Sequence, residues 1–130
     1  MIGLDTGAII DLFRGDKKIV GLLENSGETF ASTVLNYQEL LFGLDPGNGI
    51  HKIEGDYYEK LFQNLTMFNL EPGSAKKSSE IFWEMRKRGM DAGKFDAIIA
   101  GIFLSNGVKQ IVTRNKRHFS GIKELRVVSY

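Results

Sequence analysis

Three acidic residues are the first candidates for chemistry in this 130-residue chain: Asp5, Glu39 and Asp96. They lie in the segments IGLDTG, YQELLFG and KFDAIIAGIF, each of which is mostly apolar. Carboxylates that lie close together repel one another, and a hard cation with oxygen ligands, such as Mg²⁺ or Mn²⁺, normally stabilises such a cluster. Because Mg²⁺ usually works on phosphates, the three acids together suggest phosphate chemistry.

Each acid also has a purely structural interpretation. Asp5 and Asp96 stand at the start of helical patterns, and aspartate is among the preferred N-cap residues, so each could simply cap its helix. Glu39 has the apolar Leu35 and Phe42 on its helical face, where an unpaired carboxylate is costly. A solvated helix edge would nevertheless accommodate it. The acids are therefore informative only as a set.

The composition argues against several other chemistries. The chain has no cysteine and only two histidines, His51 and His118. Disulfides and thiolate chemistry are excluded, and a histidine-rich zinc site lacks ligands. The sequence also contains no G-x-x-x-x-G-K-[ST] or G-x-G-x-x-G loop that would hold a nucleotide.

Length and charge predict one soluble domain spanning residues 1–130. Apolar residues make up 42% of the chain and charged residues 25%, which are ordinary globular values. The formal net charge is +1, so any nucleic-acid binding would depend on local patches. The start shows no signal-peptide pattern and the longest apolar run, 97–104, is far too short to span a bilayer. We therefore expect a cytoplasmic protein that does not enter the membrane.

Strands alternate with helices along the chain. The predicted strands cover 2–4, 28–32, 65–70, 109–113 and 125–129. The predicted helices cover 8–13, 34–43, a segment around 57–62, 74–88 and 95–105, with Ser32 or Thr33 capping the second and Ser74 the fourth. This alternation implies βα units, a mostly parallel sheet and helices on both faces.

Polar residues follow the ends of two of these strands. Asp5 directly follows the first strand, while Thr113 ends the fourth and Asn115 lies two residues beyond it. In open α/β sheets, polar chemistry gathers at the carboxyl ends of the strands. Asp96 opens the helix that leads into the fourth strand, so its distance from these ends depends on how that helix packs.

Four segments, in order and spacing, resemble the PIN-domain proteins of the VapC toxin type: IGLDTGAIIDLF, STVLNYQELLFG, FDAIIAGIF and IVTRNKRHFSGIKELRVV. The resemblance covers essentially the whole chain. It implies a three-layer α/β/α fold with a central, mostly parallel five-stranded sheet of order 3-2-1-4-5. It also implies a Mg²⁺- or Mn²⁺-dependent endoribonuclease, commonly a homodimer, that a VapB-like antitoxin inactivates by occupying its active-site groove.

Residue by residue, the resemblance assigns the catalytic and metal-binding acids to Asp5, Glu39 and Asp96. Thr113 and Asn115 match the fourth position, which is aspartate in many members and asparagine in others. With asparagine there the site has one charge fewer, so a second metal ion should bind more weakly. The expected neutral hydrogen-bonding residues around the acids are Thr6, Thr113 and Asn115.

Two other acids are candidates for lesser roles. Asp91 could supply a further carboxylate, although its GMDAG setting is more typical of a loop acid. Asp11 lies off the helical face of Asp5, and we expect it to be solvated.

The resemblance also implies a mechanism and a substrate. Metal-activated water would attack the RNA phosphorus and leave 5′-phosphate and 3′-hydroxyl ends. The positive charges beside the acids are candidates for gripping RNA: Lys94, Arg114, Lys116 and Arg117. The substitution at Asn115 leaves a second interpretation open, in which a PIN-fold module binds RNA or a partner protein without cutting.

Overall fold

A five-stranded sheet of order β3-β2-β1-β4-β5 lies at the centre of the protein. The computed structural model describes residues 1–91 and 93–130. Its strands are β1 (Ile2–Leu4), β2 (Phe30–Thr33), β3 (Thr66–Phe68), β4 (Gln110–Val112) and β5 (Arg126–Val128). Every neighbouring pair is parallel, which confirms the predicted strand order and direction. The order reverses between β1 and β4, and the carboxyl ends of strands at such a switch point are the usual place for a binding site.

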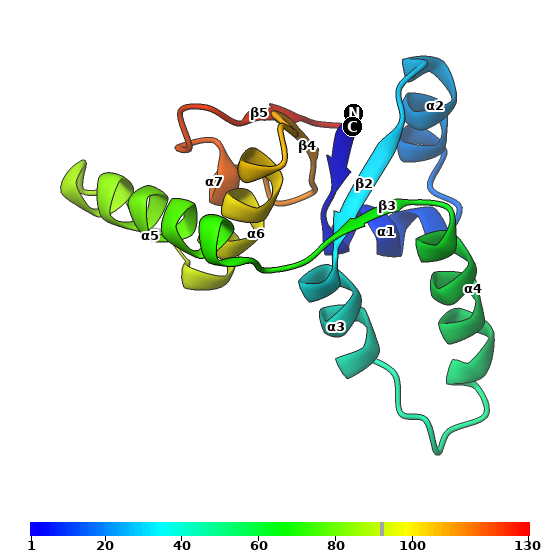
Figure 1. Cartoon of the computed structure of the whole chain (residues 1–130). Coiled ribbons are helices and arrows are strands. Elements are labelled where there is room, and N and C mark those ends of the chain that lie inside the picture. The colour runs from blue at the N-terminus through cyan, green and yellow to red at the C-terminus, as the bar shows by residue number, and fades with distance from the viewer. Residues whose placement is uncertain (92) are drawn as a thin grey trace.

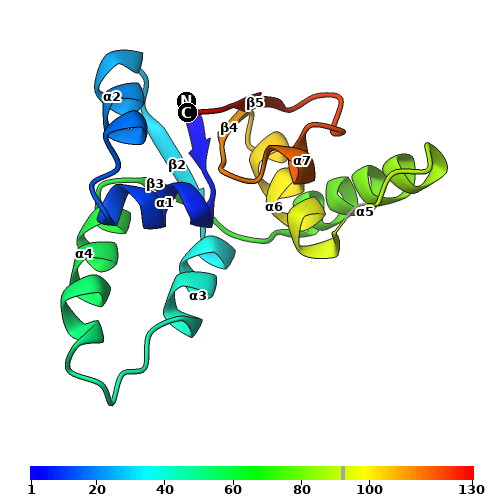
Figure 2. The same cartoon turned by 180° about the vertical axis from the view of Figure 1, so that it is seen from behind.

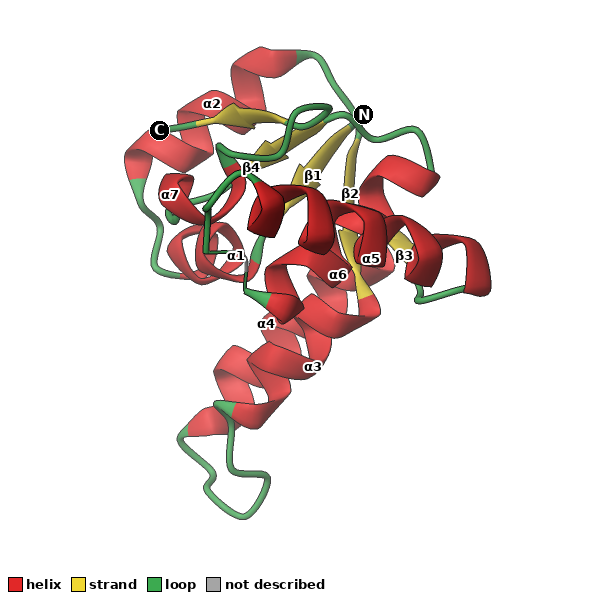
Figure 3. Cartoon of the chain, turned by 90° about the vertical axis from the view of Figure 1, so that its left-hand side faces the viewer, coloured by secondary structure: helices red, strands yellow, loops and turns green. Residues whose placement is uncertain are grey.

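Helices cover both faces of the sheet, as the α/β/α prediction requires. In chain order they are α1 (Thr6–Phe13), α2 (Lys17–Ser26), α3 (Val34–Phe42), α4 (His51–Gln63), α5 (Pro72–Lys87), α6 (Lys94–Ser105) and α7 (Lys116–Phe119). Figure 1 shows α5, α6 and α7 on one side of the sheet and α1, α2 and α4 on the other, and Figure 2 shows the same layers from behind. Helices α3 and α4 and the loop between them extend away from the sheet (Figure 3).

Two local predictions were wrong. Helix α2 was not predicted, although Ile19, Leu22 and Leu23 have helical spacing and pack into the core. Its N-cap was a second available signal, because Asp16 accepts a hydrogen bond from the Lys18 N–H at 2.9 Å. The N-cap of α5 is Glu71 and not Ser74. Ser74 lies one turn inside the helix, where its hydroxyl accepts from the Glu71 N–H at 2.7 Å, so it still stabilises the helix start.

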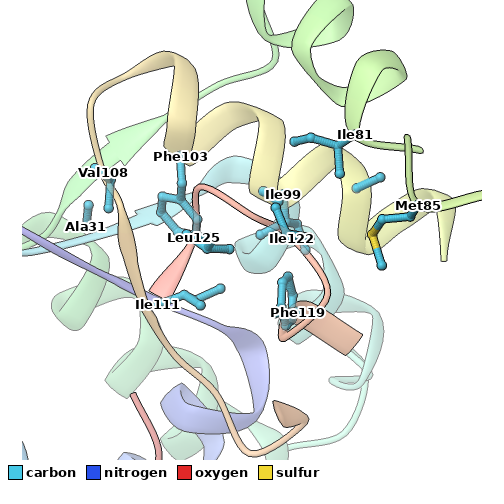
Figure 4. Packing of buried hydrophobic residues seen from close by; sticks show 12 residues of the cluster. Ala31, Ile81, Met85, Ile99, Phe103, Val108, Ile111, Phe119, Ile122 and Leu125 are labelled. Carbon is cyan, nitrogen blue, oxygen red and sulfur yellow. The ribbon is translucent and has the colours of Figure 1, made fainter. Parts of the chain in front are cut away.

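One hydrophobic cluster joins α5, α6 and α7 to the sheet (Figure 4). The apolar stripe predicted behind Asp96 is part of it, because Ile99, Ala100 and Phe103 are all buried. Phe103 lies so close to β1 that a Cβ added at Gly3 would be 2.7 Å from its ring. Glycine in β1 thus allows α6 to approach the strand that leads into Asp5.

A second cluster packs α1, α2 and α4 against the opposite face. Its largest buried side chains include Ile9, Ile19 and Tyr58. Among the residues that the structure describes, no helix combines the length and the apolar character that a membrane span would need.

Candidate active site

The candidate site lies where α1, α3 and α6 begin, at one end of the sheet (Figure 1). Asp5 follows β1 and its N–H donates to the Val112 carbonyl of β4 at 3.1 Å, so the pairing of the two central strands continues into the site. This is the switch point of the strand order, as the sequence led us to expect.

Asp5 occupies the N-cap position of α1, but its side chain does not act as a cap. Its Oδ1 accepts from Asn36 Nδ2 at 3.1 Å, and its Oδ2 accepts from Thr113 Oγ1 at 2.9 Å. The residue is only 6% exposed. Burial raises the pKa of the Asp5 carboxyl, while the hydrogen bonds from Thr113 and Asn36 oppose that rise. The two neighbours therefore fix the direction of this carboxylate and offset part of the effect of its burial.

Asn36 was missed by the sequence analysis. It is completely buried in the first turn of α3, where its N–H donates to the side chain of Thr33, the N-cap, at 3.1 Å. Its amide group donates to Thr6 Oγ1 at 3.0 Å as well as to Asp5. An asparagine in an otherwise apolar helix, one turn before Glu39, was the available signal, since residues three apart share a helix face.

Glu39 lies one turn beyond Asn36 and accepts from Thr6 Oγ1 at 3.2 Å. It is exposed, and so is its supposed apolar neighbour Phe42, at 83%. The apolar surroundings inferred from the sequence are therefore wrong on that side, and this part of α3 is solvent-accessible. Partial burial raises the pKa of the Glu39 carboxyl, and the negative charges of Asp5 and Asp96 raise it further.

Asp96 is not a helix cap. The N-cap of α6 is Gly93, and Asp96 lies in the first turn with its Oδ2 3.0 Å from Nδ1 of His118 on α7. A Cβ at Gly93 would be 2.9 Å from the same oxygen, so glycine leaves room for this carboxylate. Burial raises the pKa of Asp96, the positive charge of His118 lowers it, and the charge of Asp5 raises it. His118, like Asn36, was not predicted as a site residue.

Thr113 joins Asp5 to the loop after β4. Besides donating to Asp5, its hydroxyl accepts from the Asn115 N–H at 3.0 Å. Asn115 thus contributes its backbone N–H to the site. It occupies the N-cap position of the short helix α7, but its side chain makes no capping hydrogen bond. The exposed Lys116 and Arg117 follow in α7.

The remaining candidates are distributed around this centre. Arg117 and Asp91 line a hollow of about 390 Å³ together with Asp96 and His118. Lys94 instead lines a groove between α5 and α6 that is mostly apolar. Asp11 is buried and not solvated as predicted, because Arg114 and Tyr130 contact it from distant parts of the chain.

The carboxylates fit a hard cation by their chemistry. Their donors are all oxygen, and the negative charge of Asp5 raises the pKa of both Glu39 and Asp96. Over residues 1–91 and 93–130, however, no three acidic, histidine or cysteine side chains converge closely enough to hold a metal ion. The three carboxylates therefore suit such an ion by donor type, whereas in this structure they lie too far apart to form a complete ligand set.

Fold and site together define a PIN-type protein. The family model described as the PIN domain matches residues 2–125, and the chain belongs to that family. This confirms the resemblance inferred from the four segments. A comparison with curated protein sequences gives no significant match.

Several solved structures share the fold, among them members of the VapBC family of toxin–antitoxin systems. VapBC2 from Rickettsia felis, bound to a promoter DNA fragment, superposes with a TM-score of 0.84 at 19% identity, over 100% of this chain and 99% of the other. DNA-bound VapBC from Salmonella typhimurium gives a TM-score of 0.83 at 22% identity, over 98% and 96%. FitAcB from Neisseria gonorrhoeae gives 0.81 at 20% identity, over 98% and 96%. At these identities the likeness concerns the fold.

Proposed function

We propose that this protein is a metal-dependent endoribonuclease of the VapC type and the toxin of a toxin–antitoxin pair. The observation that supports this most directly is the electrostatic coupling of Asp5, Glu39 and Asp96 at the switch point of a PIN-domain sheet. Asp5 and Asp96 lie at helix starts and Glu39 in the middle of α3, and carboxylates near one another destabilise the fold unless a cation neutralises them. A function that uses the cation explains why they are there.

The metal ion is Mg²⁺ or Mn²⁺ in this proposal, since oxygen ligands without histidine or cysteine suit these ions. Asp5 and Asp96 would hold it, with Glu39 completing its surroundings. When bound, such an ion neutralises phosphate charge and makes water a nucleophile near neutral pH. RNA hydrolysis by that water would leave 5′-phosphate and 3′-hydroxyl ends.

Other residues of the chain would position the acids and bind the phosphates of the RNA. Asn36 and Thr113 hold Asp5 in one orientation, which is what ligand-positioning residues do in metal sites. Thr6 directs the carboxylate of Glu39, whose raised pKa suits it to accept a proton from the attacking water. The proposed phosphate contacts are the basic residues Arg114, Lys116 and Arg117 of the segment after β4, and Lys94, which lines the groove between α5 and α6.

A protein partner follows from the same proposal. The similar solved structures include VapBC complexes, and we infer a VapB-like antitoxin that occupies the groove and places a basic side chain near the acids. We also infer a homodimer, as the family resemblance implies. A toxin that acts on RNA and is restrained in this way would work in the cytoplasm.

Metal linkage tests the proposal. With Mn²⁺ at about 100 times its Kd, the free energy of unfolding should rise by about 2.7 kcal/mol, because the ion binds only the folded site. Asp96→Asn should abolish this increase, whereas Asp56→Asn, which changes an exposed acid of α4, should leave it intact. No increase in the unmodified protein, together with no cleavage of any RNA, would favour a PIN-fold module that binds without cutting.

A further inference from the structure

A buried acid outside the proposed metal site connects that site to the last strand. Asp11, on α1, is 8% exposed. Its Oδ1 lies 3.2 Å from Nη1 of Arg114, and its Oδ2 accepts a hydrogen bond from the hydroxyl of Tyr130. We call these three residues, Asp11, Arg114 and Tyr130, the Asp11 clamp.

The clamp holds Arg114 across the first turn of α1. A Cβ at Gly7 would lie 3.0 Å from Nε and 3.3 Å from Nη2 of Arg114, so the side chain passes directly over this glycine. Gly7 follows Asp5 and Thr6 in the sequence, and Arg114 follows Thr113, the donor to Asp5. The guanidinium therefore lies against Gly7 and Asp11 of α1, and Gly7 and Arg114 each adjoin a residue of the acidic centre in the sequence.

The clamp leaves the guanidinium partly open to solvent. The Arg114 side chain is 45% exposed, against 11% for Asp11. A guanidinium carries five N–H donors, and the contact with Asp11 engages one of its terminal nitrogens. The other donors remain suited to the bidentate contacts that arginine makes with phosphate.

Tyr130 strengthens the anchor without neutralising it. Burial raises the pKa of the Tyr130 hydroxyl, and the hydrogen bond to Asp11 raises it further, so the hydroxyl keeps its proton and donates. Tyr130 thus fixes the second oxygen of Asp11, while the first oxygen faces Arg114. Because Asp11 is buried, losing a partner would also destabilise the fold, so stability and RNA binding have to be measured separately.

We propose that Asp11 and Tyr130 are positioning residues that hold Arg114 beside Asp5, where its guanidinium binds an RNA phosphate next to the one being cleaved. This inference rests on the proposed ribonuclease function. To that function the inference adds two residues, Asp11 and Tyr130, that do not contact the RNA. It also assigns Arg114 a specific role among the proposed phosphate-binding residues.

Kinetics and binding test the clamp. Arg114→Ala should raise KM for a single-stranded RNA by about tenfold with Mn²⁺, as expected for a lost charge-assisted hydrogen bond, and leave kcat within about twofold. Asp11→Asn and Tyr130→Phe should raise KM by roughly three- to fivefold, because each only loosens the arginine. In metal-free solution, Arg114→Ala should reduce the salt dependence of RNA binding by about one phosphate contact, a slope change of about 0.7.

A double-mutant cycle separates positioning from a structural role. If Asp11 acts through Arg114, the double variant Asp11→Asn/Arg114→Ala should bind RNA as Arg114→Ala does, without further loss. Lys52→Ala is the matched control, because Lys52 forms an exposed ion pair with Asp56 on α4, 3.6 Å apart, and should not change RNA binding.

Two results would overturn the clamp. One is a lower midpoint of unfolding for Tyr130→Phe and Asp11→Asn with unchanged KM and unchanged RNA affinity. The other is an additive loss of RNA affinity in the double variant. Failure of the ribonuclease proposal itself looks different, because the unmodified protein would then not cleave RNA. Metal-free RNA binding would still test the Asp11 clamp. The clamp proposal fails if the Asp11, Arg114 and Tyr130 variants bind RNA with the same affinity as the unmodified protein.

Discussion

The side-chain amide of Asn36 donates to Oδ1 of Asp5 at 3.1 Å, and this hydrogen bond joins the first turn of α3 to the end of β1. The central carboxylate of the site is thus oriented by a neutral residue that is itself fixed by Thr33. Because Asn36 and Asp5 are both buried and share this hydrogen bond, its loss should affect both the stability of the fold and the proposed chemistry.

Asn36→Ala should weaken the fold and the metal site together. Removing a buried donor leaves its partners unsatisfied, which should lower the free energy of unfolding by about 2 kcal/mol. Metal affinity should fall by about 10- to 100-fold, as is usual when a ligand-positioning residue is lost. Urea unfolding and Mn²⁺ titration measure the two effects. The control is Asn64→Ala, which changes an exposed asparagine at the end of α4, and an unchanged Mn²⁺ affinity in Asn36→Ala would contradict the account.

Glu39→Gln should separate chemistry from stability. Glutamine can still accept from Thr6, but it cannot take a proton from water, so kcat for RNA cleavage should fall by about 10²- to 10⁴-fold. The free energy of unfolding should change by less than about 0.5 kcal/mol, because Glu39 is exposed. Single-turnover cleavage and urea unfolding of the same preparation make the comparison. Cleavage at the unmodified rate would remove Glu39 from the mechanism.

Without metal, the protein should lose stability as the pH rises from about 4. The pKa values of Asp5, Glu39 and Asp96 are all raised in the folded state, chiefly by burial. The folded protein therefore holds more protons than the unfolded chain above the ordinary carboxyl range, so the free energy of unfolding falls with pH through the folded-state pKa values. Urea unfolding in EDTA between pH 4 and neutrality should show this decline.

The same decline should be smaller in Asp5→Asn, which removes one ionising group and its repulsion on the other two. Saturating Mn²⁺ should also oppose it, because the ion binds the ionised carboxylates. A metal-free protein whose stability rises over this interval would show that the pKa values of the three acids are not raised in the folded state.

Two glycine substitutions should have opposite effects on stability. A Cβ at Gly101 of α6 would meet the backbone of α5 at 2.8 Å from Ser78 N and 2.9 Å from Ser74 O. Gly101→Ala should therefore cost roughly 1–3 kcal/mol or more, because the two helices must separate. Gly21, within α2, has no atom within 4 Å of such a Cβ, and Gly21→Ala should stabilise by roughly 0.5–1 kcal/mol. Chemical denaturation tests both, and an equal effect at the two positions would contradict the packing described.

The sequence predicted the parts of this protein that depend on local pattern. Strand–helix alternation predicted the parallel sheet, and the apolar stripe of Ile99, Ala100 and Phe103 predicted the buried face of α6. Helix α2 was missed although the same kind of pattern was present, in the helical spacing of Ile19, Leu22 and Leu23 after the N-cap Asp16.

Contacts between distant segments could not be predicted in the same way. Asp11 appeared solvated on a helical wheel of α1, yet the residues that cover it come from the loop after β4 and from position 130. His118 and Asn36 reach Asp96 and Asp5 only once the sheet brings α7 and α3 to the same end. Periodicity describes which face of an element is apolar, whereas polar partners depend on which elements meet.

The central claim is that Asp5, Glu39 and Asp96 support metal-dependent hydrolysis of RNA. Its most direct test is the incubation of purified protein with an end-labelled single-stranded RNA in Mn²⁺ or Mg²⁺, followed by analysis of the product ends. We expect fragments with 5′-phosphate and 3′-hydroxyl ends, which appear with the metal, disappear with EDTA and are absent with Asp96→Asn. Fragments ending in a 2′,3′-cyclic phosphate, or cleavage that persists in both EDTA and Asp96→Asn, would contradict this account.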